Sequence, residues 1–152
     1  MKLAVVGATR RIPGLTSRLQ ALALRLGTAL AKEHCTATLL LTDDPGIREL
    51  NVRFRSKDEA TDVLSFPSGT RDDGEAGHYL GDLALSLGRA AAQAEEQGHG
   101  ISEECEVLLL HGILHLLGHD HETDDGEMRA LETSMARELF GDARGLIART
   151  EG

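Results

Sequence analysis

The stretch "LLLHGILHLLGHDHETD", residues 108–124, decides the fold prediction because it places histidines at regular intervals in a leucine-rich run. His111 and His115 are four residues apart, so a helix would carry both imidazoles on one face, one turn apart. Because the run is apolar nearly all round, we expect this helix at the centre of the core. The pair alone fits either a metal site or hydrogen-bonded core histidines.

The residues after this pair favour a metal. Gly118, three residues after His115, is typical of a helix that ends in a left-handed residue. The turn that follows would return His121 to the face that carries His111 and His115. Three imidazoles with an open fourth position are typical of a catalytic zinc site rather than a closed structural one. We therefore predict one zinc ion per chain, bound by these three histidines.

Two further polar residues lie in the predicted turn. Asp120 either accepts a hydrogen bond from the distal N–H of a ligand or satisfies backbone amides of the turn. His119 is more typical of an exposed turn residue than of a fourth ligand, and it remains a possible proton donor or acceptor. The identity of a general acid or base stays open between them.

The histidine spacing matches the frame of the metzincin proteases, except at one position. Those proteases place a glutamate, the general base, directly after the first histidine. This chain has Gly112 there, so peptide hydrolysis would lack its proton acceptor. A glycine at this point also allows close packing of the helix.

The rest of the chain predicts an α/β (α+β) fold. Apolar and β-branched runs predict strands at 2–7, 35–42, 62–66 and 78–87. Helical spacing predicts helices at 13–33, 45–54 after an Asp44 cap, 88–97, 103–118 after a Ser102 cap, and about 126–140. We expect one domain over residues 1–152, with a mixed sheet of about four strands packed by helices and a buried metal helix like that of the zincins.

Composition limits the class of protein. The start of the chain has no signal-peptide pattern and no apolar run is long enough for a membrane span, so we expect a cytoplasmic protein without a membrane partner. Cys35 and Cys105 are too few for a disulfide framework, and we expect both to be reduced and buried. The net charge of −9 argues against general affinity for nucleic-acid backbones, and we expect no DNA partner. The charge is uneven, however, at +4 over residues 1–60 and −13 over the remainder.

Three segments together resemble the YbeY family of bacterial metal-dependent endoribonucleases. They are "HGILHLLGHDH", "LNVRFRSKDEATDVLSFP" and "YLGDLALS", and the resemblance runs from the "LLLT" strand through the last helix. It implies a mixed α/β sandwich, zinc on His111, His115 and His121, and a functional arginine, Arg55, in the same cleft. It also implies single-stranded RNA as substrate, in 3′ end maturation of small-subunit ribosomal RNA and in ribosome quality control. The small ribosomal subunit and its assembly factors are the implied partners.

The chain departs from this family pattern at two places. Glu59 and Ala60 precede "TDVLSFP" where many relatives have a lysine-proline pair, and His119 fills a position that is often aromatic. Neither change affects a predicted ligand. The lost basic residue predicts a somewhat weaker contact with RNA.

The predicted residues permit RNA cleavage. A metal can polarise a phosphate oxygen or lower the pKa of a bound water, and neither role needs a glutamate beside His111. Arg55 would contact the scissile phosphate and stabilise the charge of the transition state. Arg53, Arg55 and Lys57 alternate, so an extended backbone would align them along a single-stranded RNA, whereas a helical Arg53 would break the stripe. With only four aromatic residues, we expect limited base stacking and weak sequence readout.

Two alternative functions remain at this stage. One is a zinc metallopeptidase or related zinc hydrolase, which Gly112 disfavours. The other is a zinc-stabilised ribosome-assembly factor that binds RNA without cutting it.

Overall fold

The computed structural model describes residues 1–7, 11–119 and 126–141. Within these ranges the chain forms four strands and five helices, in the order that the sequence predicts, so the predicted α/β class is confirmed. The elements are β1 (Lys2–Val6), α1 (Leu15–Ala29), β2 (Cys35–Thr42), α2 (Asp44–Arg55), β3 (Val63–Pro67), β4 (His78–Ser86), α3 (Leu87–Gln97), α4 (Ile101–Leu116) and α5 (Glu127–Phe140).

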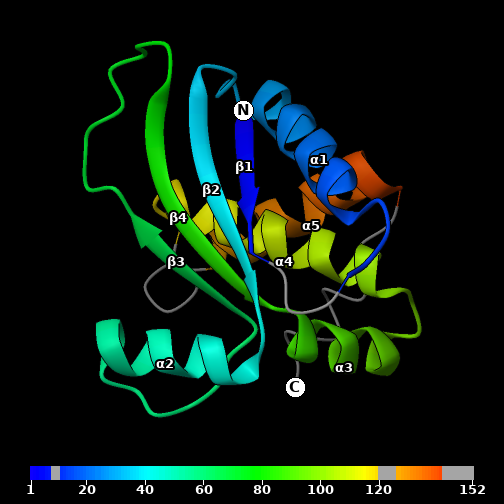
Figure 1. Ribbon diagram of the computed structural model, residues 1–152. Helices are drawn as coiled ribbons and strands as arrows, with labels where there is room; N and C mark the ends of the chain where they lie inside the picture. Colours follow the sequence, from blue (N-terminus) through cyan, green and yellow to red (C-terminus); the bar gives the residue numbers. More distant parts are fainter. Residues whose placement is uncertain (8–10, 120–125, 142–152) are drawn as a thin grey trace.

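The four strands form one mixed sheet in the order β1-β2-β4-β3. β2 pairs in parallel with both β1 and β4, whereas β3 pairs antiparallel with β4. Figure 1 shows α4 crossing behind the strands and α2 beside the end of the sheet near β3. Among the strands of the described residues, β3 is therefore at the edge of the sheet.

The two faces of the sheet pack against different helices. Leu83 and Leu85 of β4 belong to the main core, together with the leucines of α1 and α4. Ala84, between them in sequence, packs instead with Ile47 of α2 and Leu64 of β3. Because successive strand residues point to opposite faces, α4 lies on one face of the sheet and α2 on the other.

α4 is the central helix, as its composition predicts. Nearly every residue from Glu104 to Leu116 is buried, except the two histidines, which are partly exposed. A Cβ atom on Gly112 would lie 2.9 Å and 3.2 Å from the Leu83 methyl groups and 3.4 Å from Val63 Cγ2. Gly112 therefore allows α4 to pack closely on β3 and β4, which confirms the packing role predicted for it.

The ends of the first helix differ from the prediction of residues 13–33. α1 begins at Leu15 because Gly14 has a φ of 77°, in the left-handed region. It ends at Ala29, and Ala31 is again left-handed, with a φ of 55°. The chain thus leaves the helix four residues before the predicted end.

Both predicted caps are wrong by one or two residues. The side chain of Asp43, not Asp44, accepts a 2.8 Å hydrogen bond from the Gly46 amide at the start of α2. α4 begins after Gly100 rather than Ser102, and the Glu103 side chain accepts a hydrogen bond from the Gly100 amide. The acidic first turn of α4 is present as predicted and complements the helix dipole.

Both cysteines are free and buried, as predicted. Among residues 1–7, 11–119 and 126–141, no helix combines the length and the hydropathy needed to cross a membrane.

Candidate functional site

The structure brings His111 and His115 together on one face of α4. Their Nε2 atoms lie 3.1 Å apart, and their ring centroids are 4.6 Å apart. Both side chains are only partly buried, so the pair is accessible at the surface of an otherwise buried helix. The predicted pairing of these two residues is confirmed in its geometry.

A carboxylate from another helix orients the first histidine. Oε1 of Glu132, on α5, lies 2.6 Å from Nδ1 of His111, and the Glu132 side chain is only 6% exposed. A carboxylate that accepts the Nδ1 proton leaves the Nε2 lone pair directed toward His115. Histidines that bind a metal usually donate their other ring N–H to a carboxylate, a carbonyl or a water in this way.

Sequence reasoning considered Asp120 for this orienting role and did not identify Glu132. The sequence does contain a sign of it. Glu132 shares the buried face of α5 with Met128, Met135 and Ala136, and a charged residue on a core-facing stripe needs a partner. Which partner it has depends on how α5 packs against α4.

The remaining predicted ligand, His121, lies outside the described residues, as does Asp120. Gly118 is described and has a φ of 98°, so the predicted left-handed exit from α4 is confirmed. His119 follows it and lines a pocket beside the end of the helix.

The described donor atoms fit a transition metal. Two nitrogens bound to a tetrahedral zinc ion at about 2.0 Å would lie about 3.3 Å apart, close to the 3.1 Å between the two Nε2 atoms. Imidazole nitrogens are also a ligand type that zinc, copper and iron accept. The distance between the two imidazole nitrogens is therefore compatible with a shared metal ion.

Arg55 is the last residue of α2 and is fixed by two contacts with β3. Its Nη2 donates a hydrogen bond to the Ser65 carbonyl, and its Cζ lies 5.6 Å from the centre of the Phe66 ring. Ser65 Oγ in turn donates to the Gly112 carbonyl on α4, at 3.4 Å. One residue of the edge strand therefore touches both Arg55 and the helix that carries the histidine pair.

The structure decides between the two alternatives predicted for Arg53, Arg55 and Lys57, because the segment is helical and the stripe is broken. α2 continues through Arg55, so Arg53 and Arg55 are both helical and about 200° apart around the helix axis. Lys57 follows Ser56, which caps the helix in a left-handed conformation. All three basic side chains are exposed, but they do not form one row.

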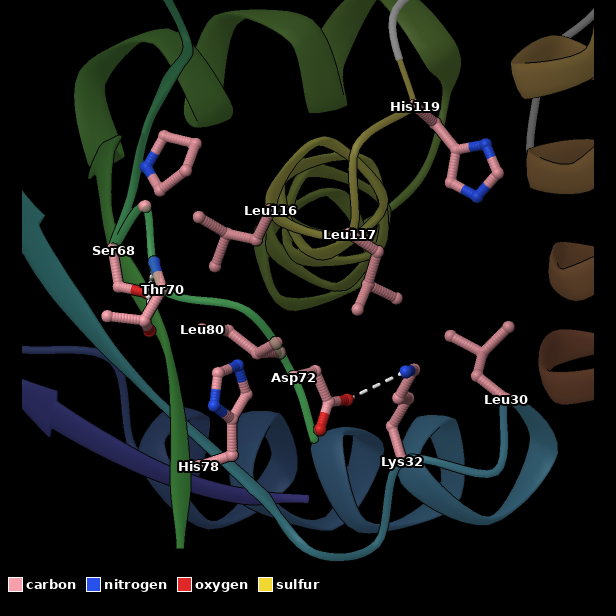
Figure 2. A pocket seen from close by; sticks show the side chains of 12 residues that line it. Leu30, Lys32, Ser68, Thr70, Asp72, His78, Leu80, Leu116, Leu117 and His119 are labelled. Carbon is pink, nitrogen blue, oxygen red and sulfur yellow. Dashed lines mark hydrogen bonds and ion pairs between the residues drawn. The ribbon is translucent and has the colours of Figure 1, made fainter. Parts of the chain in front are cut away.

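A pocket of about 510 Å³ opens beside the end of α4 (Figure 2). Figure 2 shows Leu116, Leu117 and Leu80 as its apolar walls, with an ion pair between Lys32 and Asp72 at the rim. Neither His111 nor Arg55 is among the residues that line it. The pocket and the histidine pair are therefore separate features of the described structure.

A second group of metal-donor side chains lies near this rim. The donor atoms of His34, Cys35 and Asp72 lie within 4.8 Å of one another. Asp72 also accepts hydrogen bonds from Lys32 Nζ and His34 Nε2, both at 2.8 Å. The hydrogen bond from Lys32, followed by those from the Gly74 amide and His34, holds the pKa of the Asp72 carboxyl below its usual range. The Lys32 ammonium already balances the negative charge of the Asp72 carboxylate. These contacts therefore hold the loop before β4 against the turn before β2.

Comparison with known proteins is decisive for the family. A family model described as "Endoribonuclease YbeY" matches residues 14–139, which include Arg55, the histidine pair and Glu132. The chain belongs to the YbeY family. The resemblance found in the sequence is thereby confirmed.

Individual relatives in the YbeY family are similar over most of their length. An endoribonuclease YbeY from Solibacter usitatus is 56% identical over 112 residues, covering 74% of this chain and 71% of the relative. One from Koribacter versatilis is 44% identical over 141 residues, covering 93% of this chain and 88% of the relative. The solution structure of a protein from Thermotoga maritima aligns with a TM-score of 0.62 at 26% identity, covering 91% of this chain and 89% of that one.

Proposed function

We propose that this protein is a metal-dependent endoribonuclease that hydrolyses single-stranded RNA. The observation that carries the proposal is membership of the YbeY family over residues 14–139. This span contains a convergent histidine pair on α4 and an arginine that Ser65 connects to Gly112 of the same helix. The names of the relatives describe endoribonucleases, which supports a hydrolase acting on RNA.

We further propose zinc as the metal, held by His111, His115 and His121. The donor types, the spacing and the Glu132 contact support this assignment. When bound, the metal supplies Lewis-acid polarisation of a phosphate oxygen or a water of lowered pKa. Metal identity is open to direct measurement by elemental analysis of the purified protein.

We assign the other roles in the reaction to side chains and backbone groups of the protein. Arg55 binds a phosphate oxygen of the RNA and offsets the extra negative charge of the transition state. Phe66 and the Ser65 carbonyl hold its guanidinium in place before substrate arrives, which lowers the entropic cost of binding. Glu132 holds the proton on Nδ1 of His111. His119 and Asp120 are the two candidates for moving a proton to or from the reacting oxygens.

We propose 3′ end maturation of small-subunit ribosomal RNA as the cellular role, with the small subunit and its assembly factors as partners. We also propose a part in ribosome quality control and a cytoplasmic location. These finer assignments rest on the family resemblance, and an assay on precursor ribosomal RNA tests the first of them.

The environment of Gly112 disfavours the peptidase alternative. A glutamate there would place its Cβ atom 2.9 Å from a Leu83 methyl group, so a general base of the metzincin type would have to displace the buried Leu83 side chain. The second alternative, an assembly factor that binds without cutting, predicts RNA binding with no cleavage in any metal state.

One assay separates the three functions. Metal-loaded and chelated protein are incubated with single-stranded RNA and with casein, alongside His115→Ala. The proposal expects RNA cleavage that requires metal and disappears in His115→Ala, with casein left intact. Cleavage that persists in His115→Ala would identify a contaminating nuclease and refute the proposal, as would binding without cleavage.

A further inference from the structure

Phe54 is a large aromatic side chain that the fold leaves at the surface. It lies in the last turn of α2 and is 60% exposed. Its ring centroid is 5.4 Å from that of Phe66, and the two rings meet edge to face at 68°. This contact fixes the orientation of the Phe54 ring while leaving much of its surface open to solvent.

The neighbouring residue presents a second planar group. The Arg55 guanidinium lies over the same Phe66 ring and donates a hydrogen bond to the Ser65 carbonyl. Phe66 thus holds both Phe54 and Arg55, one through an aromatic contact and the other through a cation–π contact. We call Phe54, Arg55 and Phe66 the aromatic platform.

Exposed basic residues flank Phe54 in the sequence, although Asp82 on β4 is paired with Phe66 in the sheet and the protein carries a net charge of −9. Residues 51–57 include Arg53, Arg55 and Lys57, all exposed, and no acidic residue. An exposed aromatic ring among basic side chains complements single-stranded nucleic acid, whose bases stack and whose phosphates are anionic. A protein partner with an acidic, apolar segment fits the ring less specifically, because it lacks the large flat face that stacking uses.

We propose that Phe54 is the stacking site for one base of the RNA substrate, beside the phosphate bound by Arg55. This inference rests on the proposed function and adds a subsite to it. Arg55 contacts Ser65, and Ser65 contacts Gly112, so these hydrogen bonds connect the aromatic platform, on the α2 side of the sheet, with the helix that carries the histidine pair. Because every base has a flat face, the subsite binds single-stranded RNA with little sequence preference.

Since the chain contains no tryptophan, Phe54→Trp introduces a single fluorescent reporter at the subsite. Leu24→Trp is the matched control, since Leu24 is also 60% exposed but lies on α1. Each variant is mixed with a single-stranded RNA and with an RNA of equal length whose bases are replaced by abasic units. Fluorescence is recorded before cleavage proceeds, and a gel confirms that the RNA is intact.

We expect the base-containing RNA to quench the tryptophan at position 54 and the abasic RNA to leave it bright, with no quenching in Leu24→Trp. Phe54→Ala should weaken RNA binding by about 5- to 150-fold, the range found for loss of one stacked base. Phe54→Leu, which keeps an apolar contact with Phe66 but has no aromatic face, should show a similar loss. Circular dichroism of each variant checks the fold.

The outcomes separate this inference from the proposed function. If wild-type protein binds and cleaves RNA but the tryptophan at position 54 is not quenched, the stacking site is wrong and the nuclease stands. Equal quenching by the abasic RNA also overturns stacking, because it indicates contact with the backbone alone. If the protein neither binds nor cleaves RNA, the proposed function fails and this subsite fails with it.

Discussion

Oε1 of Glu132 lies 2.6 Å from Nδ1 of His111, which joins α5 to the helix that carries the histidine pair. This contact sets the tautomer in which Nε2 of His111 bears the lone pair, directed at Nε2 of His115. Glu132 is therefore a positioning residue for the proposed metal site.

Glu132→Ala should lower zinc affinity by about 10- to 100-fold, the usual effect of losing an outer-shell partner. The reason is that His111 loses the acceptor that fixes its ring and its tautomer. Competition against a chelating dye measures the affinity. Glu132→Gln should lower the zinc affinity less than Glu132→Ala, because the amide oxygen of glutamine still accepts the hydrogen bond from His111.

The control for Glu132 is a second buried histidine–glutamate contact of the same length. Oε1 of Glu104 lies 2.6 Å from Nε2 of His99, and Glu104 is in the first turn of α4, seven residues before His111. Glu104→Ala should destabilise the protein and leave zinc affinity unchanged. Equal losses of affinity in both variants would show that general stability, rather than orientation of His111, controls metal binding.

Arg55→Glu should lower the rate of RNA cleavage by about 100-fold or more, the scale associated with removing one group that stabilises transition-state charge. Metal content and the free energy of unfolding should change little, because the side chain is exposed. Lys2→Glu makes the same charge reversal on β1, at the opposite edge of the sheet, and should cleave normally. Full activity in Arg55→Glu would contradict the phosphate-binding role.

Gly112→Ala should lower the free energy of unfolding by about 1 kcal/mol. A helical alanine gains about 1 kcal/mol over glycine, but overpacking of a core costs about 1–3 kcal/mol, and the new Cβ atom would lie 2.9 Å from Leu83. Urea denaturation measures the change. At Gly88, in α3, the nearest atom to an added Cβ is 3.5 Å away, so Gly88→Ala should be neutral or stabilising. Stabilisation by Gly112→Ala would contradict the close approach of α4 to the sheet.

Stability should fall at alkaline pH partly through Cys105. Burial, reinforced by Glu104 and Glu106, raises the pKa of its thiol to about 12, above the value of about 8.5 for an unfolded chain. Between these two pH values the unfolded state loses the thiol proton that the folded state keeps. The contribution of Cys105 to the free energy of unfolding is therefore fully present below the unfolded pKa and is lost as the pH rises toward about 12. Cys105→Ala should flatten this part of the stability profile, measured by urea denaturation between neutral and alkaline pH. An unchanged slope in Cys105→Ala would assign the alkaline loss to other groups.

Local periodicity was sufficient for much of the fold. The four-residue spacing of His111 and His115 places them on one helix face wherever that helix lies, because backbone geometry alone sets the angle between them. The element types followed from spacing in the same way, and they agree with the structure. Helix ends were less well predicted. The observed caps are Asp43 and Gly100, one or two residues before the predicted ones, because neighbouring residues can make alternative hydrogen bonds to the same helix end.

For the three basic residues after Val52 the sequence left two alternatives open, and the structure decided between them. An extended backbone would have aligned Arg53, Arg55 and Lys57, whereas α2 continues to Arg55 and turns Arg53 away. The aromatic platform was not predicted, because it is formed by contacts between α2 and β3, and no local sequence pattern contains those contacts.

The sequence by itself determined the α/β class, the central histidine helix and membership of the family, because local residue spacing and short motifs are sufficient to predict each of them. Only the tertiary structure decided which groups meet. Glu132 reaches His111 across 21 residues, and Ser65 reaches Gly112 across 47. Such contacts depend on how whole helices and strands pack together, and the free energy of that packing is shared among many side chains rather than encoded at either partner.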